Sequence, residues 1–247
     1  MKKLIALMLC LLMVLSMAAC GGKKENKTAD APVVDDETEV VVDETVEEEV
    51  VEEEVIEEEV VEETVEQTDG SPVGVCDGGY YENTFFGIGC ELGSDWIISS
   101  EEELAEMVGL TADMLDNESY QDVLKNADMF FDLYAMSGTS TINITVENLG
   151  ALYGEILSED EYMDLAIQNV EMMLPSAGYE DMVIEKTTTQ IGDKSYKGIA
   201  MESTYQGIAM YQRNFIMKVG EYVAAVTVTS AMEDETMDLM GYFFSLT

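Results

Sequence analysis

A run of acidic residues between positions 35 and 66 limits where this chain can build a core. The run holds 18 Asp and Glu residues and no Lys or Arg, and part of it repeats as EEEVV (47–51), EEEVI (52–56) and EEEVV (57–61). A five-residue period matches neither the period of a helix nor that of a strand, so the Val pairs cannot gather on one face. Neighbouring carboxylates also repel one another. We therefore expect a disordered, extended linker here.

The aromatic residues mark where folding begins. One Trp, 12 Tyr and 7 Phe all lie between Tyr80 and Phe244. This distribution predicts a linker over residues 20–77 and one folded domain over 78–247, which carries 30 acidic and 6 basic residues and a formal charge of −24. A domain of this length can bury about 70% of the surface of its unfolded chain, which is ample for a single core.

Charge and composition exclude several classes of function. The whole chain has a formal charge of −41 and contains no His. Nucleic-acid binding needs cations for the phosphates, so we expect no nucleic-acid partner. Without His, the chain cannot assemble a Ser-His-Asp triad, a Cys-His pair or an HExxH zinc site.

The first 19 residues have the pattern of an export signal. Lys2 and Lys3 precede an apolar stretch at 4–15 and small residues at 16–19. The apolar stretch is shorter than the roughly 20 residues of a membrane-spanning helix, so the pattern favours a cleaved signal.

The end of this signal resembles the lipobox of bacterial lipoproteins. Met17-Ala18-Ala19-Cys20 is followed by two glycines, although Met17 stands where Leu is usual. The resemblance implies that Cys20 is diacylated and becomes the new N-terminus. Two acyl chains anchor a protein stably to a bilayer. The expected location is therefore the extracytoplasmic face of the cell membrane, with the membrane as a partner through Cys20.

Three helices are predicted from their first residues. Ser100-x-x-Glu103, Ser158-x-x-Glu161 and Ser230-x-x-Glu233 have the spacing of a capping box, in which the two side chains satisfy free N–H groups of the first turn. Apolar residues follow each start at helical spacing, as far as Leu115, Leu174 and Phe244 respectively. Pro175 and Gly178 are expected to end the middle helix.

The remaining segments alternate with a two-residue period and predict strands. Expected strands lie at about 83–91, two at about 129–148, and a four-strand meander at about 181–230, separated by turn residues such as Gly138 and Gly220. In the second hairpin strand, Ile142, Ile144 and Val146 are expected to point one way, with the polar residues between them on the other face. An antiparallel meander packed with helices indicates the α+β class.

This order of elements resembles the PsbP-like fold, an α/β/α sandwich. The resemblance covers roughly residues 80–247 and is carried by Tyr81-Glu82-Asn83 leading into Phe86-Gly87-Ile88-Gly89, by Trp96, and by the stretch from 174 to 230 that includes Tyr205-Gln206-Gly207. Members of this group mostly bind other proteins or have no assigned role. The resemblance therefore implies a fold and a non-enzymatic binding role, without catalytic motifs.

The candidates for chemistry are few. Cys76 and Cys90 are the thiols that remain after the signal and Cys20, and an exported chain permits a disulfide. A strand running away from the turn near Asp77 instead favours a free Cys76 and a buried Cys90, and the sequence leaves both arrangements open. The sequence contains no dinucleotide fingerprint, SxxK motif or calcium loop, so we expect no cofactor and no metal site.

Two functions remain open on the sequence alone. Tyr205, Tyr211 and Arg213, on neighbouring predicted strands, are a candidate contact patch for a protein or a cell-envelope component. The first hypothesis is a membrane-anchored, non-enzymatic binding module. The alternative is a cell-envelope hydrolase, such as a glycosidase, that uses two carboxylates about 5 to 9.5 Å apart.

Overall fold

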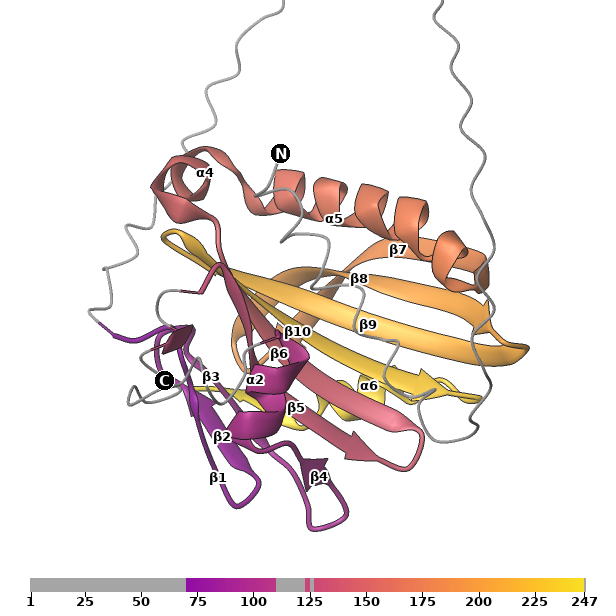
Figure 1. Ribbon diagram of the computed structural model, residues 1–247, viewed down its shortest axis with the longest axis horizontal. Coiled ribbons are helices and arrows are strands. Elements are labelled where there is room, and N and C mark those ends of the chain that lie inside the picture. Colours follow the sequence, from indigo (N-terminus) through magenta and orange to yellow (C-terminus); the bar gives the residue numbers. More distant parts are fainter. Residues whose placement is uncertain (1–69, 110–122, 125–126, 247) are drawn as a thin grey trace, which may run out of the picture. The chain divides into compact units, whose positions relative to one another are not determined.

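A computed structural model describes residues 70–109, 123–124 and 127–246. Within these residues the chain consists mostly of antiparallel strands with a few short helices, so the α+β class is confirmed with strands in the majority. The strands form one sheet of seven and one of four (Figure 1). Cys20 and the acidic run at 35–66 lie outside the described residues.

The seven-stranded sheet joins two local units. One is the hairpin predicted at 129–148, and the other is the meander predicted at 181–230; both are present. They meet where β6 pairs with β10, from Ser140 opposite Ser230 to Asn148 opposite Tyr222. The order across the sheet is β4 (Ile97–Ile98), β5 (Met129–Ser137), β6 (Ser140–Asn148), β10 (Tyr222–Ala231), β9 (Ile208–Val219), β8 (Lys194–Tyr205) and β7 (Tyr179–Ile191).

The four-stranded sheet is not predicted from the sequence. The single strand expected at 83–91 is wrong, because residues 84–87 form a turn between two strands. Asn83 Oδ1 accepts a hydrogen bond from Phe86 N at 3.1 Å, and Gly87 adopts a φ of +68°, so the chain reverses there. The order is β1 (Val75–Asp77), β2 (Tyr80–Asn83), β3 (Ile88–Glu91) and β11 (Phe243–Ser245).

Two helices begin at predicted capping boxes. Ser100 Oγ accepts a hydrogen bond from Glu103 N at 3.3 Å, and Glu103 Oε2 accepts one from Ser100 N at 2.8 Å; Ser158 and Glu161 repeat this pattern. The predicted extension of the first helix to Leu115 falls outside the described residues. The helices are α2 (Glu101–Met107), α4 (Gly150–Ile156), α5 (Glu159–Met173), the 3₁₀ turn η2 (Pro175–Ala177) and α6 (Thr236–Met240).

The third capping box is wrong. Ser230 lies inside β10 and pairs with Tyr211 of β9 and Ser140 of β6, so its backbone is held in a strand. The last helix, α6, begins only at Thr236, whose backbone N–H and hydroxyl both donate to Asp234 Oδ1. It is five residues long, and Phe244, expected on its face, lies in β11.

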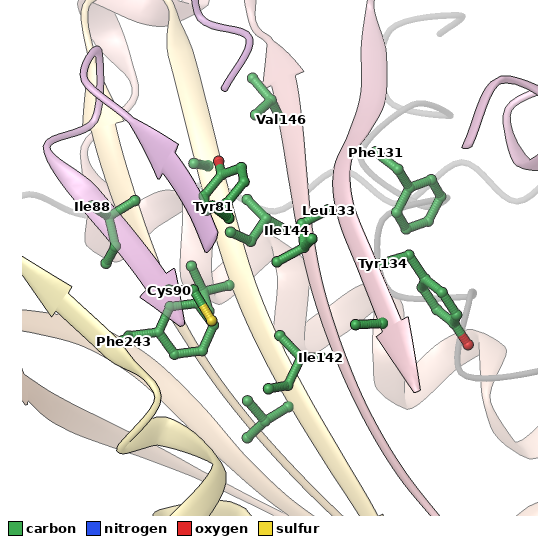
Figure 2. Close-up of a cluster of buried hydrophobic side chains, with 14 of the residues drawn as sticks. Tyr81, Ile88, Cys90, Phe131, Leu133, Tyr134, Ile142, Ile144, Val146 and Phe243 are labelled. Carbon is green, nitrogen blue, oxygen red and sulfur yellow. The ribbon is translucent and has the colours of Figure 1, made fainter. Parts of the chain in front are cut away.

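The four-stranded sheet packs on one face of the seven-stranded sheet, which we call the sheet face. Tyr81 and Cys90 point from the four-stranded sheet toward Leu133 and Ile144, whereas Phe131 points away on the far side of β5 (Figure 2). Ile142, Ile144 and Val146 all lie on the sheet face, as their alternation predicts. Much of the largest hydrophobic core lies in this layer, and that core continues to Phe131 and to Leu104 of α2.

The opposite face, which we call the helix face, is covered by α5 and α2. Tyr162 and Met163 of α5 pack against Ile199, Ile216 and Val223 from three strands. The middle of the helix face is polar but still buried. Its buried polar residues are Thr141, Asn143, Thr145, Glu147, Gln212, Asn214, Thr227 and Thr229.

Packing begins before residue 78. Pro72 O accepts a hydrogen bond from Asn83 Nδ2 at 2.9 Å, and all of β1 pairs with β2. In the part of the chain that the structure describes, no helix combines the length and apolar character needed to span a membrane.

Candidate functional site

A cavity of about 470 Å³ lies where the two sheets and α2 meet at the β5 edge. This volume falls in the range of small-molecule sites. Apolar side chains line much of it, among them Trp96, Ile98, Leu104 and Phe131. Trp96 is buried and meets Tyr242 edge-on at 5.6 Å between ring centroids, so it also packs into the core.

A β-bulge in β5 shapes the wall of this cavity. The register between β5 and β6 shifts between Phe131 and Leu133, which leaves Asp132 as the extra residue. The side chain of Phe131 therefore lies on the helix face, and that of Leu133 lies on the sheet face. Asp132 turns toward the four-stranded sheet and lines the cavity.

Three donors hold the Asp132 carboxylate. Gly74 N lies 2.8 Å from Oδ1, while Tyr81 Oη and Asn83 Nδ2 donate to Oδ2 at 2.5 and 2.8 Å. Burial raises the pKa of Asp132, and the hydrogen bonds from Tyr81, Asn83 and Gly74 act in the opposite direction. The carboxylate therefore ties the segment before β1, strand β2 and strand β5 together. It acts as a clamp that fixes the cavity wall.

Much of the cavity rim is formed by the main chain of glycines, and few charged side chains lie there. Gly74, Gly78, Gly79 and Gly93 all line it. Glu101 and Asp132 are its charged lining residues among those described. Both are acidic, so the cavity favours a ligand with neutral or positively charged groups.

Both remaining cysteines are free thiols. Cys76 of β1 is exposed at the cavity, whereas Cys90 of β3 is buried in the core. Tyr81 pairs with both of them, so they lie two strand spacings apart, about 9 to 10 Å, which is beyond disulfide reach. Burial raises the pKa of Cys76 and raises that of Cys90 to about 12, so neither is an activated nucleophile.

Glu147 is a second buried carboxyl group, and it is not predicted from the sequence. Glu147 of β6 is 3% exposed on the helix face, and Tyr162 of α5 donates a hydrogen bond to its Oε2 at 3.0 Å. Burial raises its pKa to about 7, offset partly by Tyr162 and reinforced by the charge of Asp128. The alternation along β6 correctly places Glu147 away from the core, but no local signal shows that α5 covers that face.

The structure does not bring the predicted contact residues together. Tyr211 and Arg213 lie on the sheet face of β9, and Arg213 Nη1 donates to Thr187 Oγ1 of β7 at 3.2 Å. Tyr205 lies on the helix face, where its ring meets Tyr179 at 4.7 Å. Tyr211 and Arg213 remain a candidate pair, separated from Tyr205 by the sheet itself.

Metal binding has no candidate within the described segments. They contain no group of three or more Cys, Asp or Glu side chains placed to hold an ion.

The chain was compared with known proteins. No protein-family model matches it, and no curated protein matches it. A solved structure from Bacteroides thetaiotaomicron VPI-5482 matches 64% of this chain at 11% identity and a TM-score of 0.34, and the match spans 45% of that protein. LpqN, involved in cell envelope biogenesis of Mycobacterium tuberculosis, matches 63% of this chain at 12% identity and a TM-score of 0.34, over 76% of its own length.

Proposed function

We propose that this protein is a lipoprotein whose acylated Cys20 holds it on the extracytoplasmic face of a cell membrane. The support is the sequence itself: a basic start, an apolar stretch and small residues ending at Cys20. The acidic segment then acts as the spacer between the anchor and the folded domain.

We further propose that the domain binds a ligand and does not catalyse a reaction. One observation carries this proposal: the two buried carboxyl groups of the described chain, Asp132 and Glu147, lie on opposite faces of the seven-stranded sheet. A carboxylate-based glycosidase needs its two groups on either side of one bond. This separation gives no support to the rival hydrolase hypothesis.

The proposed ligand site is the cavity at the β5 edge. Its aromatic and apolar walls, backbone rim and acidic lining suit a cell-envelope component or partner side chain with neutral or cationic groups. The clamp at Asp132 keeps the site formed without a ligand, which lowers the entropic cost of binding.

We also propose that the fold is PsbP-like. The support is the order of elements: α2, the β5–β6 hairpin, α5, the four-strand meander β7 to β10, and α6. The four-stranded sheet occupies the sheet face, where a strict α/β/α sandwich would carry helices.

Metabolic labelling with palmitate tests the anchor. The wild-type chain is expected to take up label and remain with membranes, while Cys20→Ala is expected to lose both properties. An unlabelled wild-type chain recovered from the cytosol would refute the anchor.

Photo-crosslinking in intact membranes tests the binding site. A photoactivatable amino acid at Ser94, on the cavity rim, is expected to give a specific adduct; the same residue at exposed Ser195 of β8 is the matched control. If both positions give equal adducts, the proposal that a ligand binds in the cavity is contradicted. If the protein chemically converts the captured ligand, the proposal of a non-enzymatic role is contradicted.

A further inference from the structure

Helix α4 exposes all of its apolar side chains. Leu152, Tyr153 and Ile156 are 66%, 44% and 63% exposed, and Gly154 is its one buried residue. Leu152 and Ile156 are four residues apart and lie on the same side of the helix. A helix that places no apolar side chain in the core does not serve the packing of the domain.

Backbone contacts hold α4 firmly at its base. A Cβ on Gly154 would lie 2.6 Å from Glu221 Cα, so only glycine allows this approach to the β9–β10 hairpin. Lys218 Nζ donates to Gly154 O at 2.6 Å, and Leu149 N donates to Glu221 O at 2.8 Å. The hairpin therefore holds α4 rigidly at this end of the sheet (Figure 1). The large side chains of α4 are exposed.

The described part of the chain begins near this same end of the domain. The described chain begins at Gly70, which lies against Phe85, and the Phe85 ring meets Tyr222 edge-on at 5.6 Å. Tyr222 directly follows Glu221, the residue on which α4 rests. Gly70 and α4 are thus linked through the touching rings of Phe85 and Tyr222 and the peptide bond between Glu221 and Tyr222.

We propose that α4 docks on the bilayer in which Cys20 is anchored, an inference that rests on the lipid anchor of the proposed function. Leu152 and Ile156 enter the acyl boundary, and Tyr153 lies at headgroup level, where tyrosine is enriched. Within α4 only Glu155 is charged, whereas the domain as a whole is strongly acidic. The contact is therefore apolar, and anionic headgroups oppose it until salt screens the repulsion.

Lipid photo-crosslinking of the full acylated chain tests this docking. The protein is reconstituted into phosphatidylcholine vesicles that contain a lipid with a photoactivatable acyl chain, and adducts are mapped by mass spectrometry. Adducts are expected in the peptide containing α4. The double variant Leu152→Ser/Ile156→Ser is expected to reduce them by about a hundredfold, because two apolar side chains no longer enter the bilayer.

Ile208→Ser is the matched control. Ile208 is also exposed, at 47%, but it is the first residue of β9 and lies at the far end of the sheet. At the rise per residue of a β-strand, it is about 36 Å from the β9–β10 hairpin. This variant is expected to keep wild-type adducts in α4. Fluorescence of Trp96, the single tryptophan, verifies that all variants are folded.

The outcomes separate the two proposals. A chain that fails to float with vesicles refutes the anchor, whereas a chain that floats through Cys20 without adducts in α4 refutes the docking alone. If the double variant gives as many adducts in α4 as the wild type, the docking is also refuted. In phosphatidylglycerol vesicles, adducts in α4 are expected to increase with salt; a decrease would identify an electrostatic contact and contradict the proposal. Crosslinks from α4 to a protein in native membranes, with none to lipid, would assign this surface to a protein partner instead.

Discussion

Replacing Glu147 by Gln is expected to stabilise the domain above neutral pH. Burial raises the pKa of Glu147 to about 7 from an ordinary value of 4.5. Between these two pH values, Glu147 is protonated in the folded state and ionised in the unfolded state. The wild-type stability contributed by this group is therefore full below pH 4.5 and is lost as the pH rises through about 7. Gln resembles the protonated side chain at every pH and still offers an oxygen to Tyr162.

The pKa shift sets the size of the effect. A rise from 4.5 to about 7 corresponds to about 3 kcal/mol of unfolding free energy, since one pKa unit is worth about 1.4 kcal/mol. The wild type is expected to lose roughly this amount between pH 4.5 and 8 through this group. The variant is expected to keep it, so the two chains differ most at pH 8.

Urea unfolding followed by Trp96 fluorescence measures the difference. Trp96 is buried, and it is the single tryptophan, so the signal reports on the folded domain. Glu185→Gln, at an exposed position of β7, is the matched control for removal of one negative charge. The reasoning is refuted if Glu147→Gln and the wild type show the same dependence of unfolding free energy on pH between 5 and 8.

Three further outcomes are expected. Asp132→Asn should lower the unfolding free energy by about 1 to 3 kcal/mol in urea titrations, because the N–H₂ group of the new Asn would face groups that themselves donate hydrogen bonds. Unchanged stability would contradict the clamp. Gly198→Ala should destabilise by about 3 kcal/mol or more, because the added Cβ would lie 1.9 Å from Asn214 O; a melting temperature equal to the wild type would contradict this. Iodoacetamide should alkylate Cys76 in the native protein and Cys90 only after unfolding, by mass spectrometry; a disulfide between them under mild oxidation would contradict the strand register.

Local signals predicted much of this fold. The capping boxes at Ser100 and Ser158 each involve hydrogen bonds between residues only three positions apart. Both helices begin directly after these serines, as predicted. The turns at Gly138 and Gly220 adopt the positive φ of 56° and 58° for which glycine is suited. Ser230 carries the same motif as the other two serines, but pairing on both sides of β10 outweighs a cap that satisfies a few N–H groups.

Long-range contacts could not be predicted in this way. The cavity draws on residues 73–79, 93–104 and 131–133, which are distant in sequence, and the β5 bulge turns Asp132 toward β2 at this place. Glu147 has the polar position that alternation assigns to it, yet its burial depends on Tyr162 of another element. Tyr205 and Tyr211 are close in sequence, but one sits before the hairpin turn and one after it, and the register places them on opposite faces.

The pairing of β11 with β3 has a consequence for biogenesis. The last strand of the chain, from Phe243 to Ser245, completes the sheet begun by residues 75–91. In the proposed export from the N-terminus, β3 would leave the translocation channel long before β11. During that export, the edge of β3 would stay unpaired until residues 243–245 have crossed. An unpaired strand edge of this kind is open to proteases and to aggregation, so chaperones would be needed in this interval.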